Sequence, residues 1–126
     1  MLLRERVFVG EQGVSIEAER DGRDGEAVHV VAVADGVVVG TCRLLLGPRT
    51  ARLSRMAVEP LRRRAGVGRA VLDRAERCAR DAGAERISLH AQLPVRALYE
   101  SLGYTALGEI FEEEGIEHVL MEKRLA

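Results

Sequence analysis

Cysteine is scarce in this sequence, and several features that mark particular protein classes are missing. The only two cysteines, Cys42 and Cys78, form no Cys-x-x-Cys pair and have no histidine at ligand spacing, so no metal site is expected. No apolar run approaches the roughly 18 residues of a membrane span, and charge follows Met1 too soon for a signal peptide. The net charge is -1, so nothing favours nucleic acid as a partner. We therefore expect no membrane or nucleic-acid partner and a cytoplasmic location.

The length and composition are those of an ordinary globular domain. The chain has 126 residues, of which 47% are hydrophobic and 31% are charged. That length supports one hydrophobic core but not two, so residues 1–126 are expected to form a single domain.

The stretch from Ala51 to Ala82 organises the rest of the chain. It predicts a strand over 51–58, which ends near Pro60 because proline cannot donate to a strand ladder. A loop rich in arginine and glycine follows, and then an amphipathic helix that ends at Gly83. The apolar face of this helix is predicted to hold Val71, Leu72, Ala75, Cys78, Ala79 and Ala82, and the polar face Arg69, Asp73, Arg74, Arg77 and Arg80.

The loop before this helix has the character of an anion site. The first N–H groups of a helix have no partner within it, and the helix dipole is positive there. Gly66 and Gly68 allow a phosphate to approach the main chain, and Arg62–Arg64 add positive charge. The pattern suits a pyrophosphate. It is neither a P-loop, since no Gly-Lys-Ser/Thr follows, nor a dinucleotide fingerprint, since Val71 occupies the third glycine position.

Three stretches carry a resemblance to a known family. Arg63-x-x-Gly66-x-Gly68 resembles the acetyl-coenzyme A signature of the GCN5-related N-acetyltransferases, the GNAT superfamily. Leu98-Tyr99-Glu100-Ser101-Leu102-Gly103-Tyr104 resembles its second motif, and Gln92 stands where the superfamily commonly has asparagine. Residues 6–14, His90-Ala91-Gln92 and Phe111-x-Glu113-x-Gly115-Ile116-x-His118 are similar to the ElaA-type subgroup. The resemblance covers almost the whole chain.

The order of elements gives the expected fold class. Strands are predicted at 27–34 and 37–46, joined by the hairpin signal Asp35-Gly36, with a bulge at Gly40. The remaining strands are expected at 86–92, 104–111 and 117–125, with a helix from Pro94 to Gly103. This is an α/β (α+β) fold with a mixed, mainly antiparallel sheet flanked by helices. Residues 1–9 read as the end of a helix and 10–26 as a loop, so the first strand of the GNAT-like sheet is expected to be missing.

The resemblance implies an enzyme and assigns roles to particular residues. Acetyl-CoA would be the cosubstrate, and a backbone N–H near Val58 would stabilise the oxyanion. Tyr99 would be the general acid toward the leaving thiolate, because a phenol is protonated at neutral pH. The cofactor-binding residues would be Met56, Ala57, Val58, Arg63, Arg64, Ala65, Gly66, Val67, Gly68, Arg69, Gln92 and Tyr99. Gln92 would either contact the cofactor or cap the following helix, while Tyr104 belongs to the core.

The general base is left open among several residues. His90 ranks first, because the resemblance places its strand beside the cofactor cleft, and histidine has a suitable pKa range. The other candidates are His29, His118, the acidic run Glu112–Glu114 and a water molecule. Glu11 and Glu17 are candidates for contact with the acceptor.

The sequence thus predicts an N-acetyltransferase that moves an acetyl group to a primary amine, small or peptidyl, by direct attack. Two alternatives remain: a longer-chain acyltransferase resembling acyl-homoserine-lactone synthases, and a non-catalytic acyl-CoA-binding sensor or scaffold. A homodimer is a further expectation, because dimers are common in the family. The acceptor amine is not encoded in any pattern that can be read from the sequence.

Overall fold

A mixed β-sheet runs through the computed structural model, which describes residues 2–9, 14–21, 27–58 and 66–125. Within these residues the strand order is β1-β2-β3-β4-β5-β6-β8-β7, and only β5 and β6 run parallel. The mixed, mainly antiparallel sheet expected from the sequence is confirmed. The strands are β1 (Leu2–Val9), β2 (Val14–Asp21), β3 (Ala27–Ala34), β4 (Val37–Leu46), β5 (Thr50–Val58), β6 (Arg86–Gln92), β7 (Thr105–Glu113) and β8 (Ile116–Arg124).

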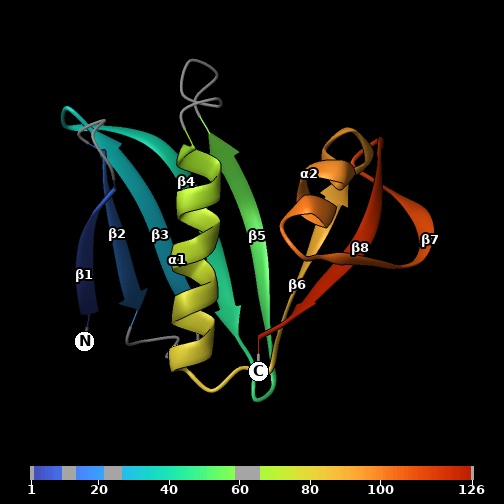
Figure 1. The fold of residues 1–126 in the computed structure, drawn as a ribbon, viewed down its shortest axis with the longest axis horizontal. Coiled ribbons are helices and arrows are strands. Elements are labelled where there is room, and N and C mark those ends of the chain that lie inside the picture. Colours follow the sequence, from blue (N-terminus) through green and yellow to red (C-terminus); the bar gives the residue numbers. More distant parts are fainter. Residues whose placement is uncertain (1, 10–13, 22–26, 59–65, 126) are drawn as a thin grey trace.

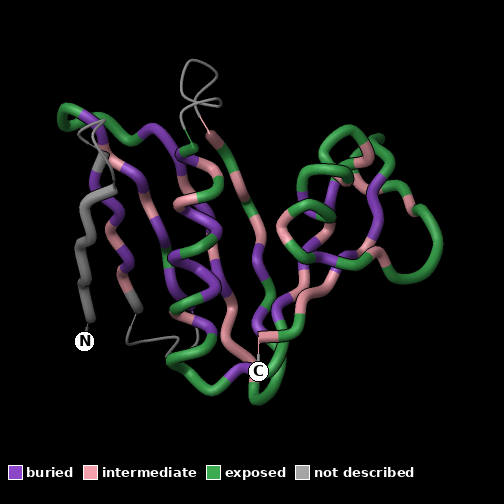
Figure 2. The backbone as a smooth tube through the Cα atoms, viewed as in Figure 1, coloured by how far each residue is buried: buried purple, intermediate pink, exposed green. Residues whose placement is uncertain are grey.

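Helices lie over one face of this sheet (Figure 1). The long helix α1 (Val67–Asp81) crosses β3, β4 and β5, while the short η3 (Leu93–Val95) and α2 (Arg96–Ser101) follow β6. Figure 2 shows buried positions along the strands beneath α1, whereas most of β7 is exposed. The core therefore fills the space between α1 and the centre of the sheet. No helix in the described ranges is long and apolar enough to cross a membrane.

The N-terminal prediction was wrong in two places. Residues 2–9 form β1 instead of the end of a helix, and most of the expected loop is the strand β2. Strand β2 pairs with β3 from Val14 opposite Ala34 to Asp21 opposite Ala27, so two strands precede β3 where none was expected. Apolar and polar residues alternate from Val14 to Glu19, and Ile16 is buried. That period of two indicates a strand more strongly than the polar composition indicates a loop.

The β3–β4 hairpin confirms the turn prediction and brings α1 close to the sheet. Asp35 and Gly36 have φ angles of 52° and 78°, which are left-handed values typical of a two-residue hairpin turn. The pairing shifts between Ala32 and Val33, next to the expected bulge at Gly40. A Cβ at Gly40 would lie 2.8 Å from Val67 Cγ1. Glycine at this position therefore allows the first turn of α1 to rest directly on β4.

Helix α1 ends where the sequence predicted, but its buried face is wider than expected. It ends where Gly83, at φ 88°, donates to the Arg80 carbonyl and Ala84 donates to the Ala79 carbonyl, a Schellman arrangement. Arg74 was predicted on the polar face and is only 6% exposed. It follows Val67 and Val71 along one helical row, and α1 also contacts the unexpected strand β2.

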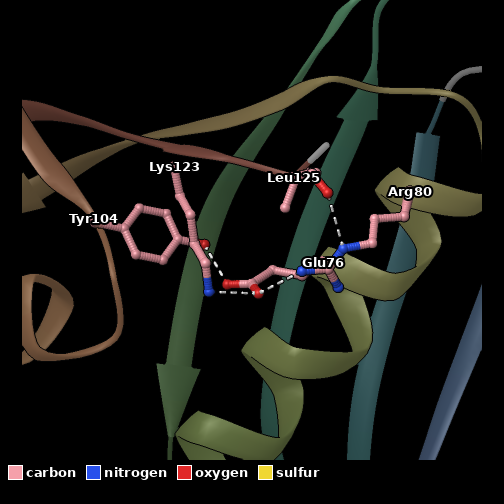
Figure 3. Close-up of polar contacts among 5 residues, drawn as sticks. All are labelled: Glu76, Arg80, Tyr104, Lys123 and Leu125. Atoms are coloured by element: carbon pink, nitrogen blue, oxygen red, sulfur yellow. Dashed lines mark hydrogen bonds and ion pairs between the residues drawn. The ribbon is translucent and has the colours of Figure 1, made fainter.

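A buried carboxylate ties α1 to the C-terminal part of the sheet (Figure 3). Glu76 is 3% exposed and accepts hydrogen bonds from the Tyr104 hydroxyl at 2.7 Å and from Lys123 Nζ at 2.9 Å. Arg80 lies one turn further along α1 and donates through Nε to the Leu125 carbonyl. Burial and the bond to Glu76 raise the pKa of Tyr104. Tyr104 is a core residue, as the sequence predicted.

Candidate active site

Strands β5 and β6 separate after the first three residues of each. Strand β5 pairs in parallel with β6 only from Thr50 opposite Arg86 to Arg52 opposite Ser88. Beyond that point β5 stays on β4, whereas β6 follows β8 as far as Gln92 opposite His118. The β4–β5 pairing shifts near Arg55, whose φ is 55°. The two strands diverge toward the end of the sheet that carries the first turn of α1 (Figure 1).

The opening between these strands forms a cleft of about 990 Å³. Its walls come from the second half of β5, the second half of β6, the first turn of α1 and helix α2. Histidine, glutamate and tyrosine side chains contribute polar groups to this lining. Among the lining residues are Ser54–Val58, Gly66, Gly68, Arg69, Leu72, Leu89–Gln92, Tyr99, Glu113 and His118.

The first turn of α1 presents main-chain groups to this cleft. Gly66 is the residue before the helix, with φ 77°, and a Cβ at this position would have no atom within 4 Å. Gly68 and Arg69 also line the cleft, whereas the Val67 side chain is buried against Gly40. The first N–H groups of a helix are available to a ligand. Of the predicted cofactor loop, Arg63, Arg64 and Ala65 lie outside the described residues.

The wall formed by β5 carries Met56, Ala57 and Val58, three of the residues that the sequence predicts to bind the cofactor. These three residues line the cleft, and Ala57 and Val58 pair with Thr41 and Gly40 of β4 on their other side. In the part of the chain that the structure describes, no register joins them to β6. Main-chain groups on this edge can therefore bind an extended ligand as an added strand would.

Tyr99 lies on α2 and reaches the cleft from the helical face of the sheet. It is 9% exposed, and its ring packs edge-on against Tyr104 with the centroids 5.7 Å apart. Burial, and then the nearby Cys42 thiol, raise its pKa above the ordinary value of 10.0. The phenol is consequently protonated throughout the neutral range and is able to donate a proton.

A cluster of polar side chains lies on the face of the sheet opposite to α2 and Tyr99. His90 Nδ1 lies 3.3 Å from Glu113 Oε1 and 3.4 Å from Arg52 Nη2, and the His90 ring meets Phe111 edge-on at 5.0 Å. His118 Nε2 lies 3.6 Å from Glu113 Oε2. The sequence predicts His90, His118 and the acidic run as separate candidates for the general base. It gave no indication of Arg52, which comes close to His90 because β5 and β6 pair in parallel up to this residue.

Other sequence-predicted residues lie elsewhere. His29 is exposed on β3, between Glu19 and Arg43 in the sheet register, and is not among the residues that line the cleft. Glu17 lies on β2 and does not line it either, while Glu11 falls outside the described residues. Gln92 lines the cleft, but its side chain makes no cap hydrogen bond to η3. Of its two predicted roles, the helix cap is therefore wrong.

Metal binding is not indicated by the described residues. Among them, no three histidine, cysteine, aspartate or glutamate side chains are arranged to hold a metal ion. The chemistry available in the cleft is that of main-chain donors, a protonated phenol and imidazole groups.

Comparisons with known proteins agree with this geometry. The family model described as "Acetyltransferase (GNAT) domain" matches residues 5–125. A protein of Bacillus subtilis (strain 168), provisionally named as the acetyltransferase BSU40680, is 37% identical over 125 residues. That match covers 97% of this chain and 85% of the relative.

Solved structures share the fold. The crystal structure of Escherichia coli ElaA is 23% identical, with a TM-score of 0.71, over 82% of this chain and 73% of that one. An aminoglycoside 6'-N-acetyltransferase, solved in complex with coenzyme A, is 19% identical, with a TM-score of 0.68. This second match covers 80% of the present chain and 74% of the other.

Proposed function

We propose that this chain, which belongs to the GNAT family and is an N-acetyltransferase, uses acetyl-CoA as its cosubstrate. The acetyl group would pass to a primary amine, which attacks the thioester directly. The observation that carries the proposal is the separation of β5 from β6, with Tyr99 on the wall of the resulting cleft. A cytoplasmic location and a homodimer, both expected from the sequence, remain predictions.

The cofactor would lie along β5 and end at α1. Its pantetheine arm would pair with the main chain of Met56–Val58, which has no strand partner on the cleft side within the described residues. Its pyrophosphate would bind the first turn of α1 at Gly66, Gly68 and Arg69, where N–H groups and the helix dipole favour an anion. Arg63, Arg64 and Ala65 are predicted to complete this loop. The fold shared with an acetyltransferase that binds coenzyme A supports this placement.

The transfer needs a base, an oxyanion donor and an acid. His90 would take a proton from the attacking amine as the carbon–nitrogen bond forms. A main-chain N–H near Val58 would stabilise the negative oxygen of the tetrahedral intermediate. As the carbon–sulfur bond breaks, Tyr99 would give its proton to the thiolate of coenzyme A. The raised pKa of Tyr99 keeps that proton in place until the thiolate develops.

The acceptor would reach the reacting carbon from the face that carries His90. Arg52, Glu113 and His118 lie on that face, away from α1. Arg52 is exposed there and Glu113 is partly exposed, so a small or peptidyl amine with further polar groups fits this approach. Gln92, at the end of β6, would contact the cofactor arm between the two faces.

Thermal unfolding with candidate ligands tests the proposal. A ligand that binds only the folded state, at about 100 times its dissociation constant, adds roughly 2.7 kcal/mol. For a domain of this size the midpoint should rise by about 10 °C. Acetyl-CoA and free CoA should produce this shift, and ATP and NAD should not. Equal shifts with ATP would contradict the cofactor assignment, and tighter binding of a long-chain acyl-CoA would favour the longer-chain acyltransferase.

A further inference from the structure

Glu113 joins two histidines that come from different strands. In the sheet order β8 lies between β6 and β7, so the Glu113 side chain reaches past β8 to His90 on β6. Its Oε1 lies 3.3 Å from His90 Nδ1, and its Oε2 lies 3.6 Å from His118 Nε2. Phe111 contacts both imidazole rings, edge-on to His90 and stacked on His118 at 5.9 Å. Carboxylate and aromatic ring together restrict how the His90 ring can turn.

His118 cannot supply a proton to Glu113 while it is neutral. Its Nδ1 lies 2.8 Å from the Ile116 carbonyl oxygen, which can only accept, so Nδ1 carries the hydrogen. The lone pair of Nε2 then faces Glu113 Oε2. Of the two histidines, only His90 is placed to donate an N–H to Glu113 in its neutral form.

The two polar neighbours of His90 Nδ1, Glu113 and Arg52, favour opposite tautomers of the ring. Glu113 accepts a hydrogen from Nδ1, whereas Arg52 Nη2, at 3.4 Å, would donate one to an Nδ1 lone pair. Both bonds would be charge-assisted, because carboxylate and guanidinium are both ionised, but the contact with Glu113 is the shorter and is partly buried, whereas the contact with Arg52 is exposed. Arg52 is exposed, so water can satisfy its N–H groups. The balance favours a hydrogen on Nδ1 and a lone pair on Nε2.

We propose that Glu113 is a positioning residue for His90, holding Nδ1–H so that Nε2 can accept the proton of the amine. The inference rests on the proposed function. When the amine gives its proton to Nε2, His90 becomes an imidazolium, whose Nδ1–H stays bonded to the Glu113 carboxylate. Glu113 itself exchanges no proton, and the negative charge beside the ring stabilises the cation. Glu113 therefore acts on the reaction only through His90.

The tautomer of His90 can be read directly by ¹⁵N NMR of histidine-labelled protein. The chain has three histidines, so single replacements assign each signal. The wild type should show hydrogen on His90 Nδ1, and Glu113→Ala should move it to Nε2, because Arg52 is then the polar neighbour of Nδ1. Glu112→Ala removes an equal charge from the same hairpin at an exposed position and should leave the tautomer unchanged. Hydrogen on His90 Nε2 in the wild type would overturn the inference.

Steady-state kinetics with an accepted amine separate positioning from structure. Glu113→Ala should lower kcat about 100-fold and leave the KM for acetyl-CoA unchanged, while Glu113→Asp should recover part of the loss. Retention of wild-type kcat by Glu113→Ala would refute the positioning role. If the wild type binds no coenzyme A, the proposed function fails, but the tautomer measurement still decides whether Glu113 orients His90.

Discussion

Lys123 Nζ lies 2.9 Å from Glu76 Oε1 and joins strand β8 to helix α1 across the helical face of the sheet. The two side chains differ in their access to water, since that of Lys123 is 25% exposed and that of Glu76 only 4%. The two possible replacements therefore differ in their consequences. Without Lys123, the Glu76 carboxylate stays buried and loses its ion-pair partner. Without the charge of Glu76, the Lys123 ammonium can turn toward solvent.

Lys123→Met should destabilise the protein more than Glu76→Gln. The methionine keeps the aliphatic stem that passes Gly103. Among the described residues, the buried carboxylate then keeps the Tyr104 hydroxyl and Arg80, at 3.9 Å, as its partners. We expect a loss of about 3 kcal/mol for Lys123→Met and about 1 kcal/mol for Glu76→Gln. Urea unfolding of both variants measures the difference. The reverse order would mean that Glu76 is hydrated in the folded state.

Tyr99→Phe should lower kcat about 100-fold while acetyl-CoA still raises the unfolding midpoint. The ring keeps its packing and only the proton donor is lost. Tyr104 is the other tyrosine of the chain and binds Glu76 instead of lining the cleft, so Tyr104→Phe is the matched control. That control should change kcat by no more than a few-fold. Undiminished turnover in Tyr99→Phe would assign the acid role to another group.

Stability should fall in alkaline solution, and Cys42 should account for the first part of the fall. Burial raises the pKa of this thiol from 9.0 to about 12. Between these values the unfolded chain loses a proton that the folded protein keeps, so the contribution is intact below pH 9 and decreases as the pH rises. The slope is about 1.4 kcal/mol per pH unit.

Chemical unfolding of wild type and Cys42→Ala between pH 8 and 11 provides the measurement. The alanine variant should lose less stability over this range than the wild type does. Tyr99 and Tyr104 also have raised pKa values and should add to the slope in both proteins above pH 10. Identical slopes below pH 10 would show that the Cys42 thiol ionises as readily folded as unfolded.

Gly40→Ala should weaken the contact between α1 and the sheet. The added Cβ would lie 2.8 Å from Val67 Cγ1, closer than carbon atoms approach in proteins, so the first turn of α1 must shift. We expect a cost of about 1–3 kcal/mol. Val67→Ala removes the clashing methyl group, and a double-mutant cycle should show that the double variant recovers part of the loss. Strict additivity would place the strain elsewhere.

Local chemistry made much of the fold predictable. The Asp35-Gly36 turn, the stop of α1 at Gly83 and the end of α2 near Gly103 each depend on a few neighbouring residues. The glycine-rich start of α1 was likewise predictable from a short, contiguous motif, whereas the place of Tyr99 beside the cleft followed from the resemblance to the family. The strand β2 also carried a local signal, its alternating pattern from Val14 to Glu19, which the polar composition obscured.

The sequence by itself determined the family, the amphipathic helix α1 and the turns, because these follow from residues close together in the chain. Only the tertiary structure decided that Glu76 is buried beside Lys123 and that Glu113 reaches His90. The first pair depends on how α1 packs on the sheet and the second on strand order and register, and they bring together residues 47 and 23 positions apart. Register is set by the pairing of whole strands and by core packing, so no local pattern could have placed these side chains in contact.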